Sequence, residues 1–310
     1  MAKLDETAAG VYIIAVTPFT DSGALDLDST DRMVDFYLER GVTGFTILGM
    51  MGEAPKLTLA ESRSFVKRVL NRLDGRVPVV VGVSSPGFAS MSELSSAVMD
   101  AGAAGVMVAP PGTLKTDDQI VAYYGNVVET IGLGTPFVLQ DFPQSTNVVM
   151  APSVIAKIVR TLPSCVMLKH EDWPGLSKLS ALRDMMSRDE LRRISILVGN
   201  GGLFLPEEME RGADGAMTGF AYPEMMVGVV NAYRAGQRDR ARDIFDAYLP
   251  LARYEQQPGP GLAIRKYVLQ KRGAIASAAL RKPAPKLTAA DIDEVERMIA
   301  RQELRLKEIG

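Results

Sequence analysis

The sequence predicts an α/β protein, a (β/α)8 TIM barrel with a C-terminal extension of three helices. Eight short apolar runs of β type alternate with segments whose apolar residues repeat at helical spacing. Successive runs begin 19 to 34 residues apart, about the length of a strand and a helix together. The runs are nearly continuous in apolar residues, which is typical of parallel strands buried on both faces. The pattern therefore favours a closed parallel barrel over an open sheet that has one face exposed to solvent.

The strands are expected at the eight runs themselves. A doubly wound open sheet is the rival architecture, but it usually has fewer strands and a nucleotide-binding fingerprint. Neither GxGxxG nor GxxxxGK[ST] occurs in this sequence. The expected strands begin near Val11, Gly44, Pro78, Ala104, Pro136, Cys165, Ile194 and Ala213.

The helices between these runs carry recognisable end signals. Thr58 and Glu61 form a capping box at the start of an amphipathic segment over residues 59–74. Gly41 follows an earlier apolar stripe and predicts a helix end there. Pro152 stands where the first turn of a helix tolerates proline. These signals place helices between the strands, as the barrel requires.

After about residue 236 the pattern becomes purely helical. Helices are expected over 238–255 and 262–271, and a third one from Thr288 with Asp291 as its capping partner. No low-complexity linker precedes them. We therefore expect a barrel over 1–235 and a helical extension over 236–310 that packs on it.

Composition excludes several function classes. The chain has 310 residues with 35 Lys and Arg against 37 Asp and Glu, a net charge of −2, so neither nucleic acid nor a membrane is an expected partner. The longest charge-free stretch, Val77 to Ser92, is too short and polar to span a bilayer. The single Cys165 fits a reducing, cytoplasmic location. One histidine and one cysteine provide no His/Cys metal cluster, and we expect neither a metal nor a cofactor.

The sixth run holds the strongest candidate for chemistry. Strand alternation places Cys165, Met167, Lys169 and Glu171 on one face, and Val166, Leu168 and His170 on the other. Lys169 and Glu171 then both point into the barrel mouth, about 7 Å apart along the backbone. A desolvated lysine there could form a Schiff base. The plainer alternatives are a lysine that extends to solvent and a glutamate in a structural salt bridge.

Several motifs resemble one known family. Gly10-Val11, Thr17-Pro18-Phe19, the GxxGE turn Gly49–Glu53 and the lysine that ends the sixth strand match the dihydrodipicolinate synthase/N-acetylneuraminate lyase family. The resemblance covers about residues 10 to 300. It implies a homo-oligomer, a tetramer or a dimer, and an imine between Lys169 and the ketone of a small 2-oxo acid. Gly49, Met50 and Met51 would bind the substrate carboxylate through backbone N–H groups.

The chain also departs from the family pattern. Met50 and Met51 replace the two threonines of the family's usual GTTGE turn, and Gln140 stands in place of a tyrosine that ends the fifth strand. The interface tyrosine falls at about Gly112, and the arginine for the aldehyde's carboxylate falls near Ser145. These absences argue against dihydrodipicolinate synthesis.

The chain looks more like the L-2-keto-3-deoxyarabonate dehydratase branch. The likeness lies in the segments Gln140-Asp141-x-Pro143, Lys169-x-Glu171, Pro174-Gly175 and Gly215–Gly219. Gln140 cannot accept a proton, whereas Glu171 can act as a base at C3 of an iminium. We therefore expect a Schiff-base dehydratase of a 2-keto-3-deoxy sugar acid, with catalytic residues Lys169, Glu171 and Gln140.

The loop after the seventh strand is a further candidate. Gly199 and Asn200 follow this strand where barrels often bind phosphate, but in the family resembled here that loop bounds the 2-oxo acid pocket. His170 is expected to hydrogen-bond beneath the helix layer. Two alternatives to the dehydratase remain: a pyruvate-dependent aldolase or dihydrodipicolinate synthase-like enzyme with an atypical proton relay, and a non-catalytic barrel that binds a 2-oxo acid.

Overall fold

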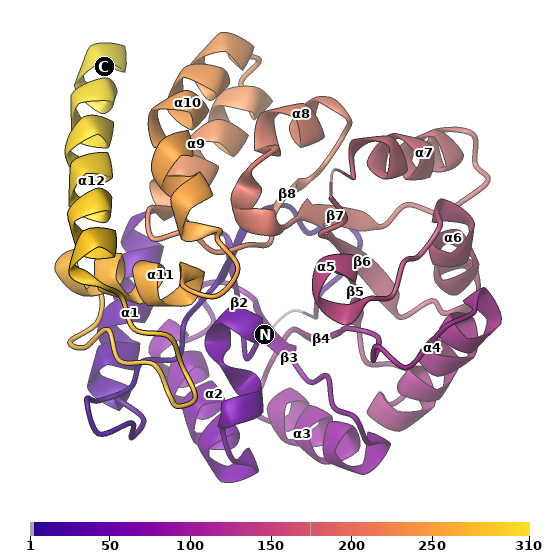
Figure 1. Ribbon diagram of the computed structural model, residues 1–310. Coiled ribbons are helices and arrows are strands. Elements are labelled where there is room, and N and C mark those ends of the chain that lie inside the picture. Colours follow the sequence, from indigo (N-terminus) through magenta and orange to yellow (C-terminus); the bar gives the residue numbers. More distant parts are fainter. Residues whose placement is uncertain (1–2, 174) are drawn as a thin grey trace.

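The computed structural model, which describes residues 3–173 and 175–310, confirms the predicted barrel (Figure 1). Each strand pairs in parallel with the next, and β8 pairs with β1, which closes the sheet. The strands are β1 Gly10–Ile14, β2 Gly44–Ile47, β3 Val79–Gly82, β4 Gly105–Val108, β5 Phe137–Asp141, β6 Cys165–His170, β7 Ser195–Val198 and β8 Gly215–Ala216.

Helices surround the sheet in the order that the sequence predicts. The ring contains α1 Leu27–Glu39, α2 Leu59–Leu73, α3 Phe88–Asp100, α4 Asp117–Ile131, the short α5 Pro143–Thr146, α6 Pro152–Thr161, α7 Leu176–Ser187, α8 Leu205–Glu210 and α9 Pro223–Arg234. The capping box of Thr58 and Glu61 begins α2, and Pro152 is the first residue of α6. None of the helices in the described part of the chain is long and apolar enough to cross a membrane.

The apolar core has two layers that the alternation of the strands separates. Side chains such as Ile14, Met107 and Met167 fill the inside of the barrel, and Leu4 joins them. A larger layer lies between the strands and the helices. Closed packing of this kind leaves space for a small molecule only above the strand ends, where the inward side chains stop.

One part of the expected alternation is wrong. Cys165 packs in the outer layer and Val166 inside the barrel, the reverse of the prediction. The register between β5 and β6 shifts here, because Phe137 pairs with Cys165 but Val138 pairs with Met167. The extra residue is a β-bulge, and it inverts the alternation before it. Beyond the bulge, Lys169 and Glu171 share a face as predicted.

The three C-terminal helices follow α9. They are α10 Arg238–Glu255, α11 Gly261–Lys271 and α12 Ala289–Ile309, with Thr288 and Asp291 forming the expected capping box. In Figure 1, α10 lies between α9 and α12, and α11 lies on the same side of the barrel as these helices. The extension therefore covers one side of the barrel mouth.

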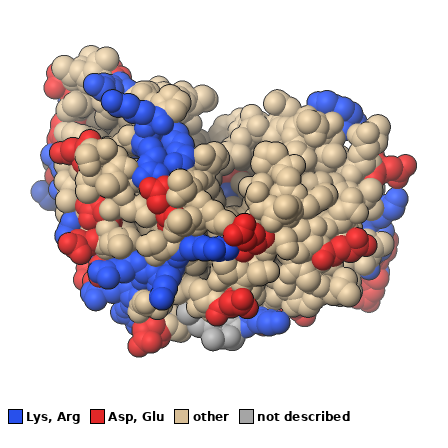
Figure 2. All heavy atoms as spheres, turned by 90° about the horizontal axis from the view of Figure 1, so that it is seen from below, with Lys and Arg blue, Asp and Glu red and all other residues tan. Residues whose placement is uncertain are grey.

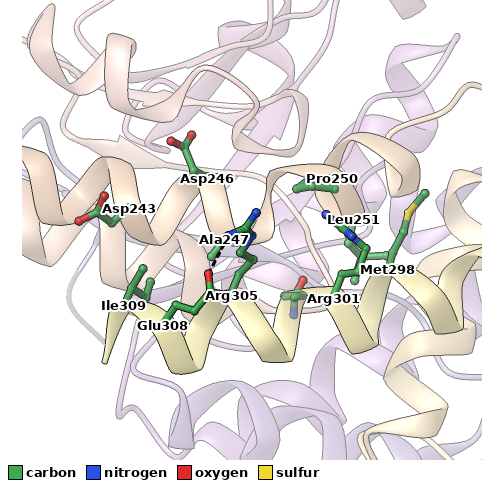
Figure 3. A pocket seen from close by; sticks show the side chains of 11 residues that line it. Asp243, Asp246, Ala247, Pro250, Leu251, Met298, Arg301, Arg305, Glu308 and Ile309 are labelled. Atoms are coloured by element: carbon green, nitrogen blue, oxygen red, sulfur yellow. Dashed lines mark hydrogen bonds and ion pairs between the residues drawn. The ribbon is translucent and has the colours of Figure 1, made fainter.

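The surface carries charges of both signs. On the face shown in Figure 2, acidic residues lie among the basic ones, and the surface is hollowed between two lobes. A groove of about 580 Å³ separates α10 from α12 and is lined by side chains that include Asp243, Arg301 and Arg305 (Figure 3). It shares no lining residue with the cavity at the strand ends described below.

The buried carboxyl of Glu208 in α8 gives the fold a testable dependence on pH. Burial, and to a lesser extent the neighbouring Glu207, raises the pKa of Glu208 from 4.5 to about 8. Between these values the unfolded chain releases a proton that the folded chain retains, so stability falls as the pH rises. We expect Glu208→Gln to gain roughly 2 to 4 kcal/mol relative to the parent between pH 5 and pH 8.

Urea unfolding of both proteins at the two pH values measures this difference. Glu129→Gln, a change at an exposed helix position, serves as the control and should show no such gain. An equal stability difference at pH 5 and pH 8 would contradict the assignment.

Candidate active site

A cavity of about 350 Å³ lies at the carboxyl ends of the strands. This is the end where barrel enzymes place their chemistry. The cavity is lined by residues at or just after the ends of β1, β2, β5, β6 and β8 and by residues from the C-terminal extension. They are Ile14, Met50, Met51, Gln140, Phe142, Gln144, Ser145, Lys169, Glu171, Thr218, Gly219, Gln256, Pro258, Gly259 and Arg265.

Three polar side chains meet at the base of this cavity. Lys169 Nζ lies 2.8 Å from Glu171 Oε1, and Gln140 Nε2 donates a hydrogen bond of 2.7 Å to the same oxygen. The register of β5 and β6, which pairs Gln140 with Lys169, brings the amide beside the amine. All three residues are buried, with exposed fractions of 4 to 5%. The carboxylate is therefore held between a donor amide and an amine in a largely dry site.

The loop after β7 holds Glu171 in place. A Cβ on Gly199 would lie 2.2 Å from Glu171 Cγ, so only glycine leaves room for this side chain. Asn200 Nδ2 donates to the Glu171 carbonyl oxygen at 2.9 Å. Gly199 and Asn200 are not among the residues that line the cavity, and neither is Gly49, whereas Met50 and Met51 are. Of the five residues expected to bind substrate, the structure thus brings two to the cavity.

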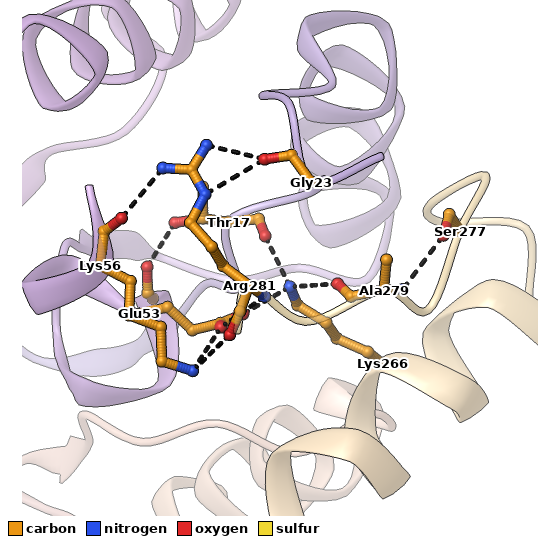
Figure 4. A network of polar contacts seen from close by, with 9 residues as sticks. Thr17, Gly23, Glu53, Lys56, Lys266, Ser277, Ala279 and Arg281 are labelled. Carbon is orange, nitrogen blue, oxygen red and sulfur yellow. Dashed lines mark hydrogen bonds and ion pairs between the residues drawn. The ribbon is translucent and has the colours of Figure 1, made fainter. Parts of the chain in front are cut away.

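The turn after β2 is tied to the C-terminal extension by a buried network (Figure 4). Glu53, in the left-handed conformation, contacts Lys266 Nζ at 2.7 Å and Lys56 Nζ at 3.0 Å and accepts from Arg281 N at 3.0 Å. Lys266 also donates to the Thr17 carbonyl oxygen at 2.8 Å. Burial lowers the pKa of Lys266, an effect that Glu53 opposes. The glutamate of the GxxGE motif therefore holds the turn, and it does not line the cavity.

Sequence reasoning missed four polar residues of the cavity wall: Gln144, Thr218, Gln256 and Arg265. Arg265 is 1% exposed, and its Nε contacts Glu255 Oε1 at 2.5 Å while its Nη2 donates to the Gly219 carbonyl oxygen at 2.7 Å. The signal available was the adjacent pair Arg265 and Lys266, which stands between apolar residues in α11. The Pro258–Gly261 turn, to which no chemistry was assigned, supplies Pro258 and Gly259 to the same wall.

A second polar cluster lies behind the strand ends, under α7. His170 Nε2 is 3.0 Å from the Gly175 carbonyl oxygen, as expected for a histidine on the outer face. Lys178 Nζ lies 2.8 Å from both Asp141 Oδ2 and Asp172 Oδ2. The cluster joins β5, β6 and α7, so it fixes the strand ends that carry Gln140 and Lys169. Pro174, one of the positions that carry the resemblance, lies outside the described residues.

The described residues contain no grouping of three His, Cys, Asp or Glu side chains that could hold a metal ion. The fold and the site define a (β/α)8 barrel with an amine–carboxylate pair at the end of its sixth strand. The model of the dihydrodipicolinate synthetase family matches residues 7–302, and the chain belongs to this family. Its members are Schiff-base-forming lyases, so the protein is an enzyme of the lyase class.

Relatives within the family carry different names. An L-2-keto-3-deoxyarabonate dehydratase from Azospirillum brasilense is 31% identical over 90% of this chain and 89% of its own. A 4-hydroxy-tetrahydrodipicolinate synthase from Methanococcus maripaludis is 30% identical over 78% of this chain and 81% of its own. A crystal structure described as dihydrodipicolinate synthase from Rhodopseudomonas palustris is 54% identical, with a TM-score of 0.95, over 97% of this chain and 100% of that chain.

The contact between Gly199 and Glu171 predicts a specific energetic coupling. Gly199→Ala should destabilise the protein by about 2 to 4 kcal/mol, since the new methyl group overlaps the buried side chain of Glu171. In a Glu171→Ala background the same change should cost less than about 1 kcal/mol, because the overlap is gone. Urea unfolding of the four proteins of this double-mutant cycle measures the coupling.

Gly125→Ala is the matched control, because Gly125 lies within α4 with nothing within 4 Å of an added Cβ. It should be neutral or stabilise by up to about 1 kcal/mol in either background. An equal cost of Gly199→Ala with and without Glu171 would show that the glycine serves another purpose.

Proposed function

We propose that this protein is a Schiff-base dehydratase that removes water from a 2-keto-3-deoxy sugar acid. The observation that carries the proposal is the arrangement of Lys169 Nζ and Gln140 Nε2 at 2.8 and 2.7 Å from one oxygen of Glu171, at the base of the cavity. An amine and a carboxylate in contact provide a nucleophile and a proton acceptor at adjacent positions.

The first stage is formation of the imine. Glu171 takes a proton from the Lys169 ammonium, and the free amine attacks the C2 carbonyl of the 2-oxo acid. The oxygen receives one proton from the attacking nitrogen, which gives a neutral carbinolamine, and a second from Glu171. Its loss as water leaves an iminium at C2. The positive nitrogen then withdraws electrons from C2 and acidifies the C3–H bond.

The second stage is loss of the C4 hydroxyl. Glu171 removes the C3 proton, and the C–H electron pair becomes the double bond of an enamine. The enamine electrons then re-form the iminium with a C3=C4 double bond while the C4–O bond breaks, and the hydroxyl leaves as water with the proton from Glu171. Transfer of a proton from C5 to C3 converts the C3=C4 double bond into a C4=C5 enol, and the enol ketonises to the semialdehyde. Hydrolysis of the iminium then frees Lys169. One carboxylate serves both proton transfers, and its contact with Gln140 keeps it oriented.

The composition of the cavity favours this reaction over aldol chemistry. Cleavage between C3 and C4 requires a base on the C4 hydroxyl, and no tyrosine is among the described residues that line the cavity. Ser145, which stands near the position of the family's arginine, lines the cavity. The methionines Met50 and Met51 add a soft apolar wall. A pyruvate-dependent aldolase or a dihydrodipicolinate synthase-like enzyme remains the second candidate, because several relatives carry synthase names.

A non-catalytic 2-oxo acid-binding barrel is the candidate from another class. It would need neither an amine that forms an imine nor a neighbouring base. We further propose that the protein works as a homo-oligomer, a tetramer or dimer, in the cytoplasm, on a small-molecule substrate and without a cofactor.

Borohydride trapping tests the nucleophile. With pyruvate or a 2-keto-3-deoxy acid, reduction should add the mass of the reduced adduct at Lys169, read by intact mass and peptide mapping. Lys169→Ala should abolish the adduct, whereas Lys157→Ala, which removes an exposed lysine, should leave it unchanged. Absence of any adduct in the parent protein would exclude the Schiff base and favour the binding barrel.

Product analysis tests the base and the reaction. Across a panel of 2-keto-3-deoxy acids, the dehydratase should release a deoxygenated semialdehyde, whereas released pyruvate would indicate an aldolase. We expect Glu171→Gln to lower turnover by about 10²- to 10⁴-fold, because it removes the proton acceptor. Full turnover by this variant would show that Glu171 is not the base.

A further inference from the structure

The C-terminal extension contributes polar groups to the cavity that the proposed chemistry does not use. Arg265 comes from α11, Gln256 follows α10, and Thr218 follows β8. All three line the same cavity as Lys169. Buried polar atoms normally have hydrogen-bond partners, so unpartnered ones in a cavity wall indicate what the cavity is built to receive.

Arg265 presents a free donor. Its Nε and Nη2 are occupied by Glu255 and by the Gly219 carbonyl oxygen, but its Nη1 has no partner among the described residues. A Cβ on Gly219 would lie 2.2 Å from Nη1, so the glycine is required for the guanidinium to reach this position. Gly219, which adjoins the guanidinium, lines the cavity too.

Gln256 presents a free acceptor at the same end. Its Oε1 is buried and has no partner among the described residues. This oxygen lies over Gly201, where an added Cβ would be 3.0 Å away, and Gly201 N donates to Thr218 Oγ1 at 2.8 Å. The loop after β7 therefore joins the acceptor of Gln256 to the hydroxyl of Thr218 in one group.

The positive charge of Arg265 is already balanced by Glu255. Glu255 Oε1 contacts Arg265 Nε, and Glu255 Oε2 accepts from Ala221 N at 3.0 Å. The guanidinium thus has its counter-ion inside the protein, and a second carboxylate on the substrate would meet no surplus cation. A hydroxyl group, by contrast, both accepts and donates a hydrogen bond, so it suits a cavity whose wall holds the donor Nη1 of Arg265 and the acceptor Oε1 of Gln256.

We propose that Arg265, Gln256 and Thr218 form a subsite for the hydroxyl groups at the far end of the substrate, so that the C-terminal extension selects hydroxylated, singly charged 2-oxo acids. This inference rests on the proposed Schiff-base function, since it assigns the remainder of the molecule whose ketone meets Lys169. It makes the extension part of the substrate-binding machinery.

The test compares three 2-oxo acids by the concentration that gives half-maximal borohydride trapping at Lys169. The first is 2-keto-3-deoxyarabonate, which carries hydroxyl groups beyond C3. The second is pyruvate, which ends at C3, and the third is 2-oxoglutarate, which carries a second carboxylate beyond C3. The parent protein should require at least 10-fold less of the hydroxylated acid than of the other two.

Two variants remove the proposed contacts. Arg265→Lys keeps a cation beside Glu255 but loses Nη1, and Gln256→Met keeps the length of the side chain but loses the acceptor. Each should raise the half-maximal concentration of 2-keto-3-deoxyarabonate at least 10-fold and that of pyruvate less than 2-fold. Gln256 is only partly buried, so its variant decides the matter even where Arg265→Lys does not fold.

Arg272→Lys is the matched control. Arg272 follows the same helix and pairs with Glu224, but it does not line the cavity, so none of the three concentrations should change. Equal shifts for pyruvate and the sugar acid in the two variants would overturn the subsite, and so would tight trapping of 2-oxoglutarate. A parent protein that traps no 2-oxo acid would instead overturn the proposed function and this inference with it.

Discussion

The structure depends on keeping charged groups dry and paired at the mouth of the barrel. Lys169 with Glu171 and Arg265 with Glu255 are ion pairs whose side chains are almost wholly withdrawn from water. Removal of one partner from such a pair leaves an uncompensated buried charge, which costs about 3 to 5 kcal/mol. Each pair therefore has to be assembled with its hydrogen bonds in place, and the surrounding loops are arranged to supply them.

This constraint explains why the C-terminal helices cannot be regarded as an accessory. Lys266 reaches from α11 to Glu53 and to the Thr17 carbonyl oxygen, and so it connects the extension to the turn after β2. The preceding residue of the same helix, Arg265, lines the cavity. Of these two consecutive cations, Lys266 thus holds the turn that carries Met50 and Met51, and Arg265 forms part of the cavity wall.

Much of the fold and the base of the cavity follow from local sequence patterns. Periodicity locates the strands, and alternation brings Lys169 and Glu171 to one face, because both signals depend on neighbours in the chain. The bulge at Cys165 and Val166 depends on the pairing of β5 with β6, and alternation alone does not reveal it. Arg265 and Gln256 escape prediction for a related reason: the packing of helices far along the chain determines that they meet the end of β8.

The roles of the glycines illustrate the same division. Gly199 and Gly219 belong to loop motifs in the sequence, and the structure shows that each makes room for a buried charged side chain, Glu171 in one case and Arg265 in the other. Neither requires the left-handed backbone that usually explains a glycine, because the limiting distances are those to an added Cβ. Gly199 and Gly219, which follow β7 and β8, have no Cβ that would overlap these side chains. The Glu171 carboxylate and the Arg265 guanidinium can therefore both reach the wall of the cavity. The proposed reactive pair and the proposed recognition group are in this way both positioned by residues at the strand ends.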